Sequence, residues 1–133
     1  MKILLTGGAG FIGSWVADCY LKAGHEVIIV DDLSTGKKEN VPPKAKFYQV
    51  DIRDKKELKK VFQKERPQII NHHAAQKNVR FSVEDPIFDA KVNILGGLNL
   101  LELAKDFGAK KFIFASTGGA IYGDTDVIPT PED

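Results

Sequence analysis

The 133-residue sequence predicts an α/β domain built on a doubly wound parallel sheet of about five strands in the order 3-2-1-4-5. Three observations predict this class. Short apolar runs alternate along the chain with segments of helical periodicity. The connections between them are short, which is typical of parallel strands joined by right-handed crossovers. The run from Val27 to Val30 is apolar at every position, as expected of a strand buried on both faces.

A first strand at 2–5 is followed by a helix that ends near Gly24. Apolar residues between 12 and 23 recur every three or four positions, which indicates an amphipathic helix. Gly24 fits the position just after a helix end. Cys19 belongs to the apolar face, so we expect it to be a buried hydrophobic residue and not a nucleophile. A second strand covers 26–30.

A third strand at 47–50 leads into the second helix. Asp54 and Glu57 have the spacing of a capping box at the start of this helix. Pro67 marks its end, because the residue before a proline is disfavoured in a helix. The chain then enters a fourth strand at 68–71.

The longest predicted helix runs from Pro86 to Phe107. Asp85 is its expected N-cap, Pro86 suits the first helical position, and Gly108 stops the helix. Its apolar residues cover more than one stripe, which indicates burial on two sides. The fifth strand covers 111–115.

The composition excludes several classes of protein. Hydrophobic residues make up 43% and charged residues 28%, which is an ordinary globular balance. The net charge of +1 gives no basic surplus for a nucleic acid or an anionic membrane. No apolar run approaches the roughly 18 residues of a membrane span, and the N-terminus does not read as a signal peptide. A single cysteine cannot form an internal disulfide, so we expect a cytoplasmic protein.

A glycine-rich segment between the first strand and the first helix carries the strongest functional signal. Gly7, Gly10 and Gly13 stand at GxxGxxG spacing. The first allows a tight turn, the second lets the backbone approach a pyrophosphate, and the third lets the helix pack closely on the strand. The helix N-terminus then offers N–H groups and a partial positive charge to the phosphates. A Walker-type phosphate loop is disfavoured because no GK[ST] follows.

The end of the second strand carries a carboxylate. Asp31 stands eighteen residues after Gly13, where an acidic side chain accepts hydrogen bonds from the ribose hydroxyls of a bound dinucleotide. A carboxylate there also repels a 2′-phosphate, so the sequence favours NAD over NADP. Asp32 follows directly, which leaves the choice between the two carboxylates open.

Five segments together resemble a known family: TGGAGFIGS at 6–14, DDLSTG at 31–36, DIRD at 51–54, HHAAQ at 72–76 and FASTGGAIYG at 114–123. They resemble the extended short-chain dehydrogenase/reductases. Within that family the chain is most similar to the NAD-dependent sugar-nucleotide epimerases of the UDP-glucose 4-epimerase type. The resemblance implies a Rossmann-type NAD-binding domain over 1–133.

The resemblance also implies an NAD contact set, which begins with Gly7, Gly10 and Gly13. At two positions of this set a structural role is the alternative to a cofactor contact. Lys77 would be a surface lysine, and Asn93 would bridge buried backbone groups. The other implied contacts are Phe11 and Ile12 at the pyrophosphate; Asp31, Asp32, Leu33, Ser34, Thr35 and Gly36 at the adenosine ribose; Asp51 and Ile52 at the adenine; His73, Ala74, Ala75, Gln76 and Lys77 along the middle of the cofactor; and Asn93 on the long helix.

The implied catalytic group is Thr117, which would help a catalytic tyrosine to polarise a sugar hydroxyl. The family chemistry also needs a Tyr-x-x-x-Lys pair, in which the lysine lowers the tyrosine pKa. Tyr20, Tyr48 and Tyr122 are not followed by lysine four residues later. We therefore expect an N-terminal part of an epimerase, truncated before the helix with this pair and before the substrate-binding part.

The implied activity is an epimerase that oxidises a nucleotide sugar, typically a UDP-hexose, to a keto sugar and reduces it on the opposite face. A homodimer is implied as well. A 4,6-dehydratase or decarboxylase of the same family is one alternative, although Gly118 and Gly119 after Thr117 favour an epimerase. A non-catalytic NAD-binding module is another. A metal site is not expected, because the adjacent His72 and His73 point to opposite faces of a strand.

Overall fold

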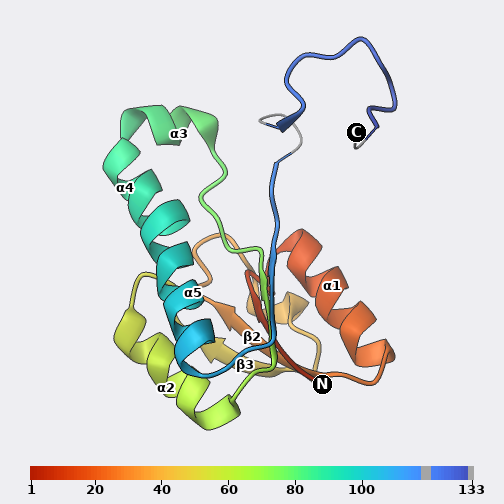
Figure 1. Cartoon of the computed structure of the whole chain (residues 1–133), viewed down its shortest axis with the longest axis vertical. Helices are drawn as coiled ribbons and strands as arrows, with labels where there is room; N and C mark the ends of the chain where they lie inside the picture. The colour runs from red at the N-terminus through yellow and green to blue at the C-terminus, as the bar shows by residue number, and fades with distance from the viewer. Residues whose placement is uncertain (118–120, 132–133) are drawn as a thin grey trace.

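The computed structural model describes residues 1–117 and 121–131 and contains one five-stranded sheet. The strand order is β3-β2-β1-β4-β5 and all four pairings are parallel, which confirms the predicted topology (Figure 1). The strand bounds lie within one residue of the predicted ones. They are β1 (Lys2–Thr6), β2 (Glu26–Asp31), β3 (Lys46–Gln49), β4 (Ile69–His72) and β5 (Lys111–Phe114).

Helices cover both faces of the sheet. α1 lies on one face, and α2 and α5 lie on the other (Figure 1). The short helices α3 and η1 fall in segments where no helix was predicted. The bounds are α1 (Phe11–Lys22), η1 (Lys38–Asn40), α2 (Lys55–Glu65), α3 (Val79–Glu84), α4 (Pro86–Ala90), η2 (Lys91–Gly96) and α5 (Gly97–Asp106).

The predicted long helix is continuous but not uniform. The consecutive segments α4, η2 and α5 form it, and η2 is a wide π-helical turn. Asp85 caps its start as predicted, since its side chain accepts a hydrogen bond from Phe88 N at 2.9 Å. The chain leaves α5 one residue before the predicted end, and Gly108 follows with a φ of +70°.

The core consists of two layers, one on each side of the sheet. Leu4, Ile28 and Ile70 point toward α2 and α5, whereas Leu5 and Ile29 point toward α1. Successive residues of a strand point to opposite faces, so an apolar strand buries both faces. These five side chains are fully buried, which confirms the expectation of a sheet covered on both sides.

Two details of the predicted helices are wrong or incomplete. Cys19 is exposed, whereas it was expected to be buried. The residues of α1 buried against the sheet are Gly13 and Ala17, because small side chains let a helix approach a sheet closely. The capping box is half formed. Asp54 accepts from two backbone N–H groups of α2, but the side chain of Glu57 pairs with Lys60 instead of returning to the backbone.

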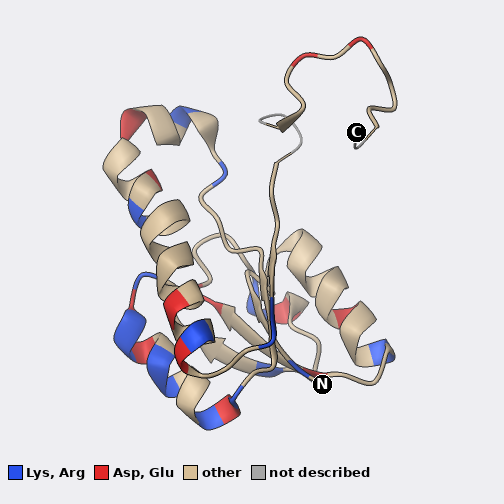
Figure 2. Ribbon diagram, viewed as in Figure 1, with Lys and Arg blue, Asp and Glu red and all other residues tan. Residues whose placement is uncertain are grey.

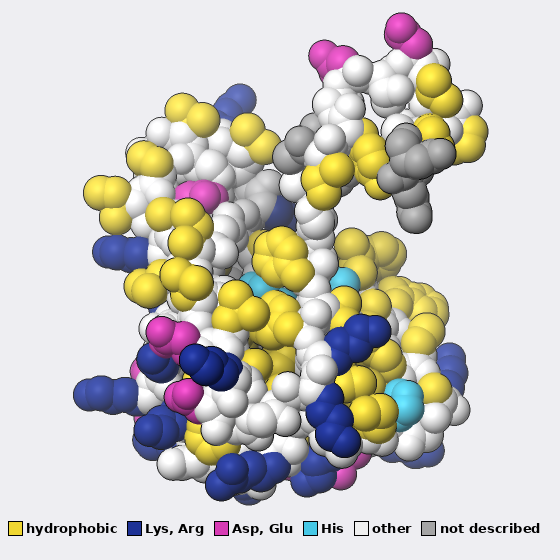
Figure 3. Space-filling view, viewed as in Figure 1, with side chains coloured by type: hydrophobic (Ala, Val, Ile, Leu, Met, Phe, Trp, Pro, Cys, Tyr) yellow, Lys and Arg dark blue, Asp and Glu magenta, His cyan; other side chains and the backbone are white. Residues whose placement is uncertain are grey.

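The long helix buries one side only. Leu100 and Leu103 are buried against the sheet, but Ile94, Leu98 and Leu101 are 63%, 51% and 47% exposed. Figure 3 shows hydrophobic side chains gathered over α4 and α5. The second side, for which the sequence predicts burial, is exposed in the single chain described, so its burial stays a prediction. Among the described residues, no helix is both long and apolar enough to cross a membrane.

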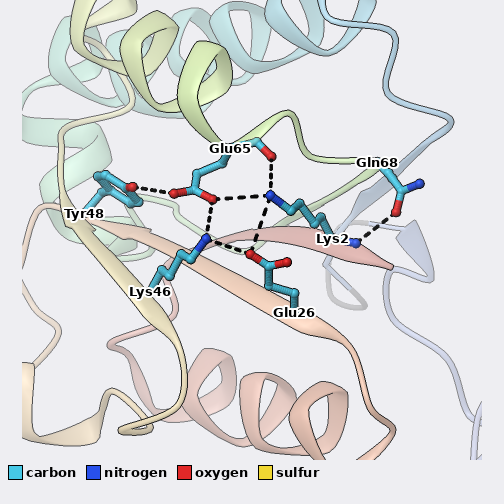
Figure 4. Close-up of polar contacts among 6 residues, drawn as sticks. All are labelled: Lys2, Glu26, Lys46, Tyr48, Glu65 and Gln68. Atoms are coloured by element: carbon cyan, nitrogen blue, oxygen red, sulfur yellow. Dashed lines mark hydrogen bonds and ion pairs between the residues drawn. The ribbon is translucent and has the colours of Figure 1, made fainter.

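Charged side chains concentrate on α2 and near the starts of the strands (Figure 2). A cluster of ion pairs and hydrogen bonds joins four elements there, β1, β2, β3 and α2 (Figure 4). Lys46 Nζ donates to Glu26 Oε1 at 2.7 Å and to Glu65 Oε2 at 2.8 Å. Tyr48 Oη donates to Glu65 Oε1 at 2.6 Å, and Lys2 Nζ lies 3.8 Å from Glu65 Oε2. We call these five residues the strand-start cluster; it lies at the opposite edge of the sheet from the glycine turn.

Candidate cofactor-binding site

The glycine turn at the end of β1 is shaped by close backbone approaches. Gly7 has a φ of +69°, which favours glycine, and its N–H donates to Val30 O at 2.9 Å. A Cβ on Gly7 would lie 2.9 Å from Ala74 N, and a Cβ on Gly13 would lie 2.1 Å from Gly7 O. Both positions therefore exclude a side chain. The roles predicted for these two glycines, a tight turn and close helix packing, match this geometry.

The N-terminus of α1 opens beside this turn. Gly10 is the N-cap residue, and no side chain of the described residues caps the helix there. The first turn of α1 carries no acidic residue. The backbone N–H groups of this turn and the positive end of the helix dipole are thus available to an anion. A phosphate is the group that such a helix end binds most readily.

Asp31 ties the glycine turn to the end of β2. It is 7% exposed, and its carboxylate accepts from Ala9 N at 3.0 Å and from Leu33 N at 2.9 Å. Leu33 has a left-handed backbone with a φ of +62° in the turn that follows. Each carboxylate oxygen has a further lone pair, so Asp31 can still accept from a ligand hydroxyl.

Asp32 is placed differently from its neighbour. Its side chain is exposed and accepts from Ser34 N at 2.9 Å and from Ser34 Oγ at 2.6 Å. These contacts are local to one turn. Of the two carboxylates, Asp31 is the one held rigidly by a second segment of the chain.

Asp51 already has a strong partner. Arg53 donates to its carboxylate through Nε, at 3.0 Å and 2.9 Å, and through the backbone N–H at 2.8 Å. These hydrogen bonds, against the opposing effect of burial, hold the pKa of Asp51 below its ordinary value. Arg53 also lies over the Phe88 ring, 4.7 Å from its centroid. The sequence did not identify Arg53, although its place in the DIRD segment beside Asp51 was a usable signal.

A cleft of about 260 Å³ lies along the carboxyl ends of the strands. Ligands bind at this edge of doubly wound sheets. Most predicted cofactor contacts line the cleft together with three apolar residues that were not predicted, Val30, Val50 and Val92. The predicted contacts on its wall are Gly7, Gly10, Phe11, Ile12, Gly13, Asp31, Asp32, Ser34, Thr35, Asp51, Ile52, His73, Ala74, Ala75 and Lys77.

Four predicted contacts lie off this wall. Leu33 takes part in the turn beside Asp31. Gly36 packs close to the Asp31 carboxylate, since an added Cβ on Gly36 would lie 3.0 Å from Asp31 Oδ1. Gln76 and Asn93 line a second cavity instead.

The second cavity, of about 500 Å³, adjoins the cleft. His73, Ala74, Ala75 and Lys77 line both, so the two spaces share the segment after β4 as a common boundary. Thr117 is exposed and lines the second cavity with Ser116. Gly118 and Gly119, which follow it, lie outside the described residues.

Asn93 clamps the backbone of Gln76. Its Oδ1 accepts from Gln76 N at 2.8 Å and its Nδ2 donates to Gln76 O at 2.9 Å. The same Nδ2 reaches Asp89 Oδ1 at 3.1 Å, and that oxygen also accepts from Gln76 Nε2 and Ser82 Oγ. The structure thus shows the backbone-bridging arrangement that was the alternative for Asn93. Its predicted cofactor contact stays a prediction.

The sequence model described as the NAD dependent epimerase/dehydratase family matches residues 3–133. A UDP-glucose 4-epimerase of Mycolicibacterium smegmatis is 43% identical over 138 residues, which cover 100% of this chain and 44% of the relative. A UDP-glucose 4-epimerase of Lacticaseibacillus casei is 42% identical, over 99% of this chain and 40% of the relative.

Solved structures give the same assignment. The UDP-glucose 4-epimerase of Thermotoga maritima, solved with UDP-glucose, is 53% identical with a TM-score of 0.92, over 99% of this chain and 43% of that chain. The Thermus thermophilus UDP-glucose 4-epimerase, solved in complex with NAD, is 53% identical with a TM-score of 0.90, over 94% and 40%. The chain spans about two fifths of the length of these proteins. It belongs to the NAD dependent epimerase/dehydratase family.

Proposed function

We propose that this chain is the NAD-binding part of an enzyme of the UDP-glucose 4-epimerase type. One observation carries the proposal. The glycine turn, the open N-terminus of α1 and the buried Asp31 meet in one cleft, and that cleft shares the segment after β4 with the cavity lined by Thr117. Relatives of the same fold are solved with NAD and with UDP-glucose, which supports both ligands.

The described residues fit a dinucleotide. The N–H groups at the start of α1 would hold the pyrophosphate, because Gly10 brings no side chain between them and the cleft. Asp31 would accept from the adenosine ribose, and Asp51 with Ile52 would lie at the adenine. When bound, NAD supplies reversible hydride acceptance from a sugar carbon.

Thr117 would act in the second cavity. Its hydroxyl would hydrogen-bond a hydroxyl of the nucleotide sugar, a UDP-hexose, and orient it for proton removal. The 133 residues contain no Tyr-x-x-x-Lys pair to take that proton. We therefore expect the chain on its own to bind NAD without epimerising UDP-sugars.

Calorimetry on the chain tests cofactor binding. NAD should bind more tightly than NADP, because the Asp31 carboxylate accepts from a ribose hydroxyl and repels a phosphate. Asp31→Asn should weaken NAD binding about tenfold or more, whereas the matched Asp32→Asn should change it less than about threefold. Equal or tighter NADP binding would contradict the assignment of Asp31.

An activity assay tests the catalytic part. The chain with NAD and UDP-galactose should give no UDP-glucose above the buffer control. Turnover that disappears in Thr117→Val would show that the proton acceptor lies within the 133 residues and that we have misplaced it.

We also propose that the exposed face of the long helix pairs with a second copy in a homodimer. Ile87, Ile94, Leu98 and Leu101 recur at helical spacing and are each at least 47% exposed. Sedimentation at micromolar concentration should show self-association that Leu98→Glu abolishes and the polar-site control Lys105→Glu leaves intact. A monomeric wild-type chain would exclude this pairing.

We further propose a cytoplasmic location for the enzyme. The single cysteine, Cys19, is exposed and unpaired in the described structure, which suits a reducing compartment.

A further inference from the structure

Thr6, the last residue of β1, lies at a buried junction of three hydrogen bonds. Its hydroxyl oxygen accepts from His73 N and Ala74 N, each at 3.1 Å. The same oxygen lies 2.7 Å from His72 Nδ1. Thr6 is 0% exposed and His72 is 3% exposed, so water does not compete for these contacts.

The number of groups at this junction fixes the direction of the third bond. A hydroxyl has one hydrogen and two acceptor lone pairs. The two backbone N–H groups occupy both lone pairs, so the Thr6 hydrogen must point to His72 Nδ1. His72 Nδ1 is then an acceptor without a proton, and the neutral ring carries its proton on Nε2.

The surroundings of His72 favour this neutral ring. Phe112 and Phe114 flank it, with ring centroids 6.1 Å and 5.7 Å away, and Gly97 faces Nε2. Phe112, Phe114 and Gly97 carry no titratable group, and the adjacent His73 is the titratable residue that acts on His72. Burial, with a smaller effect of His73, lowers the pKa of His72 to about 4. The ring is thus a constant acceptor at neutral pH.

The junction lies where two parts of the cleft lining meet. The His73–Ala74 backbone and the glycine turn both line the cleft. These two segments approach so closely that a Cβ on Gly7 would lie 2.9 Å from Ala74 N. Thr6 directly precedes Gly7, so its hydroxyl links the turn after β1 to the turn after β4.

We propose that Thr6 and His72 are positioning residues for the cofactor: His72 orients the Thr6 hydroxyl, and the hydroxyl holds the His73–Ala74 turn at the spacing that the cleft needs. The proposal rests on NAD as the ligand of this cleft. It assigns a role to two residues that do not themselves need to touch the cofactor.

The test compares two substitutions of Thr6 in the chain. Thr6→Val keeps the shape but removes the hydroxyl, which leaves two buried N–H groups without an acceptor. NAD binding measured by calorimetry under conditions where the variant is folded should weaken about tenfold or more. Thr6→Ser restores the hydroxyl and should bind within about threefold of wild type. Wild-type affinity in a folded Thr6→Val would overturn the proposal.

A second measurement does not depend on NAD or on the folding of a variant. NMR of ¹⁵N-histidine-labelled wild-type chain should show His72 as the Nε2–H tautomer at neutral pH, with Nδ1 unprotonated. A proton on Nδ1 would overturn the proposal. If the wild-type chain shows this tautomer but binds no NAD, the proposed function fails while the junction itself stands.

Discussion

Replacing Glu65 by glutamine should destabilise the chain by about 2–3 kcal/mol at pH 7. Glu65 is the most buried member of the strand-start cluster, with a side chain that is 3% exposed. Glutamine has nearly the same shape, so the change removes the charge and leaves the packing. Its amide oxygen can still accept from Tyr48, but its NH₂ group would face the ammonium of Lys46.

The magnitude follows from the contacts that are lost. The charge-assisted hydrogen bond from Lys46 at 2.8 Å contributes about 1.5–3 kcal/mol, and the weaker attraction from Lys2 at 3.8 Å adds little. Breaking a fully buried ion pair costs about 3–5 kcal/mol. Lys46 is 47% exposed and keeps its contact with Glu26, so its charge stays solvated and the cost is smaller.

The effect should depend on pH in one direction. Burial raises the pKa of Glu65, but hydrogen bonds from Lys46 and Tyr48 and the charges of Lys46 and Lys2 outweigh it, so the pKa lies below the ordinary 4.5. A lowered pKa contributes stability above the unfolded-state value, and this contribution is lost as pH falls through the folded-state value. The loss in free energy of unfolding caused by Glu65→Gln should therefore be complete at pH 7 and shrink below about pH 4.5.

Urea unfolding at a series of pH values measures this difference. Glu26→Gln is the matched control, since Glu26 contacts the same two lysines but its side chain is 42% exposed. Loss of the Glu26 charge should destabilise the chain by less than about 1 kcal/mol. Equal stabilities of wild type and Glu65→Gln at pH 7, or equal costs for the two variants, would refute the reasoning that burial makes Glu65 the central member.

Further substitutions test the backbone. Gly13→Ala should destabilise by more than about 3 kcal/mol or prevent folding, because its Cβ would lie 2.1 Å from Gly7 O. Gly97→Ala should instead stabilise by about 0.5–1 kcal/mol in the same urea assay, because at this helical position the Cβ would meet, among the described residues, only His72 Nε2 at 3.7 Å. Asp54→Ala removes the N-cap of α2 and should cost about 1 kcal/mol of stability, which calorimetry would show as a lower thermal midpoint. Asp54→Asn should keep the midpoint near that of wild type.

The fold was predictable because its signals are local. Apolar runs such as 27–30 identify strands buried on both faces, and Asp54 and Asp85 mark helix starts by side-chain caps that the structure contains. Helix α3 was not predictable in the same way. Val79 and Val83 are each 78% exposed, so this helix has no buried stripe to produce a pattern. The π turn of η2 has no residue signature that distinguishes it from an α-helix.

Much of the site was also predictable, because the carboxyl ends of parallel strands meet at one edge. The glycine turn, Asp31 and the segment after β4 therefore come together in the cleft. What the sequence could not supply is which partner each side chain chooses. Asn93 is occupied by the backbone of Gln76, which belongs to another segment of the chain. This choice depends on the distance between the two segments, which residue spacing does not encode.

The strand order has a consequence for synthesis on the ribosome. β1 is made first yet lies in the middle of the sheet, where Ile3 pairs with Val27 on one side and with Ile69 on the other. About 65 further residues must be made before the second partner exists, which takes roughly 3–13 s at typical elongation rates. During that interval one edge of an apolar strand is unpaired, and such an edge can pair with another nascent chain. Translation speed between β1 and β4 therefore sets how long the chain is exposed to misassembly.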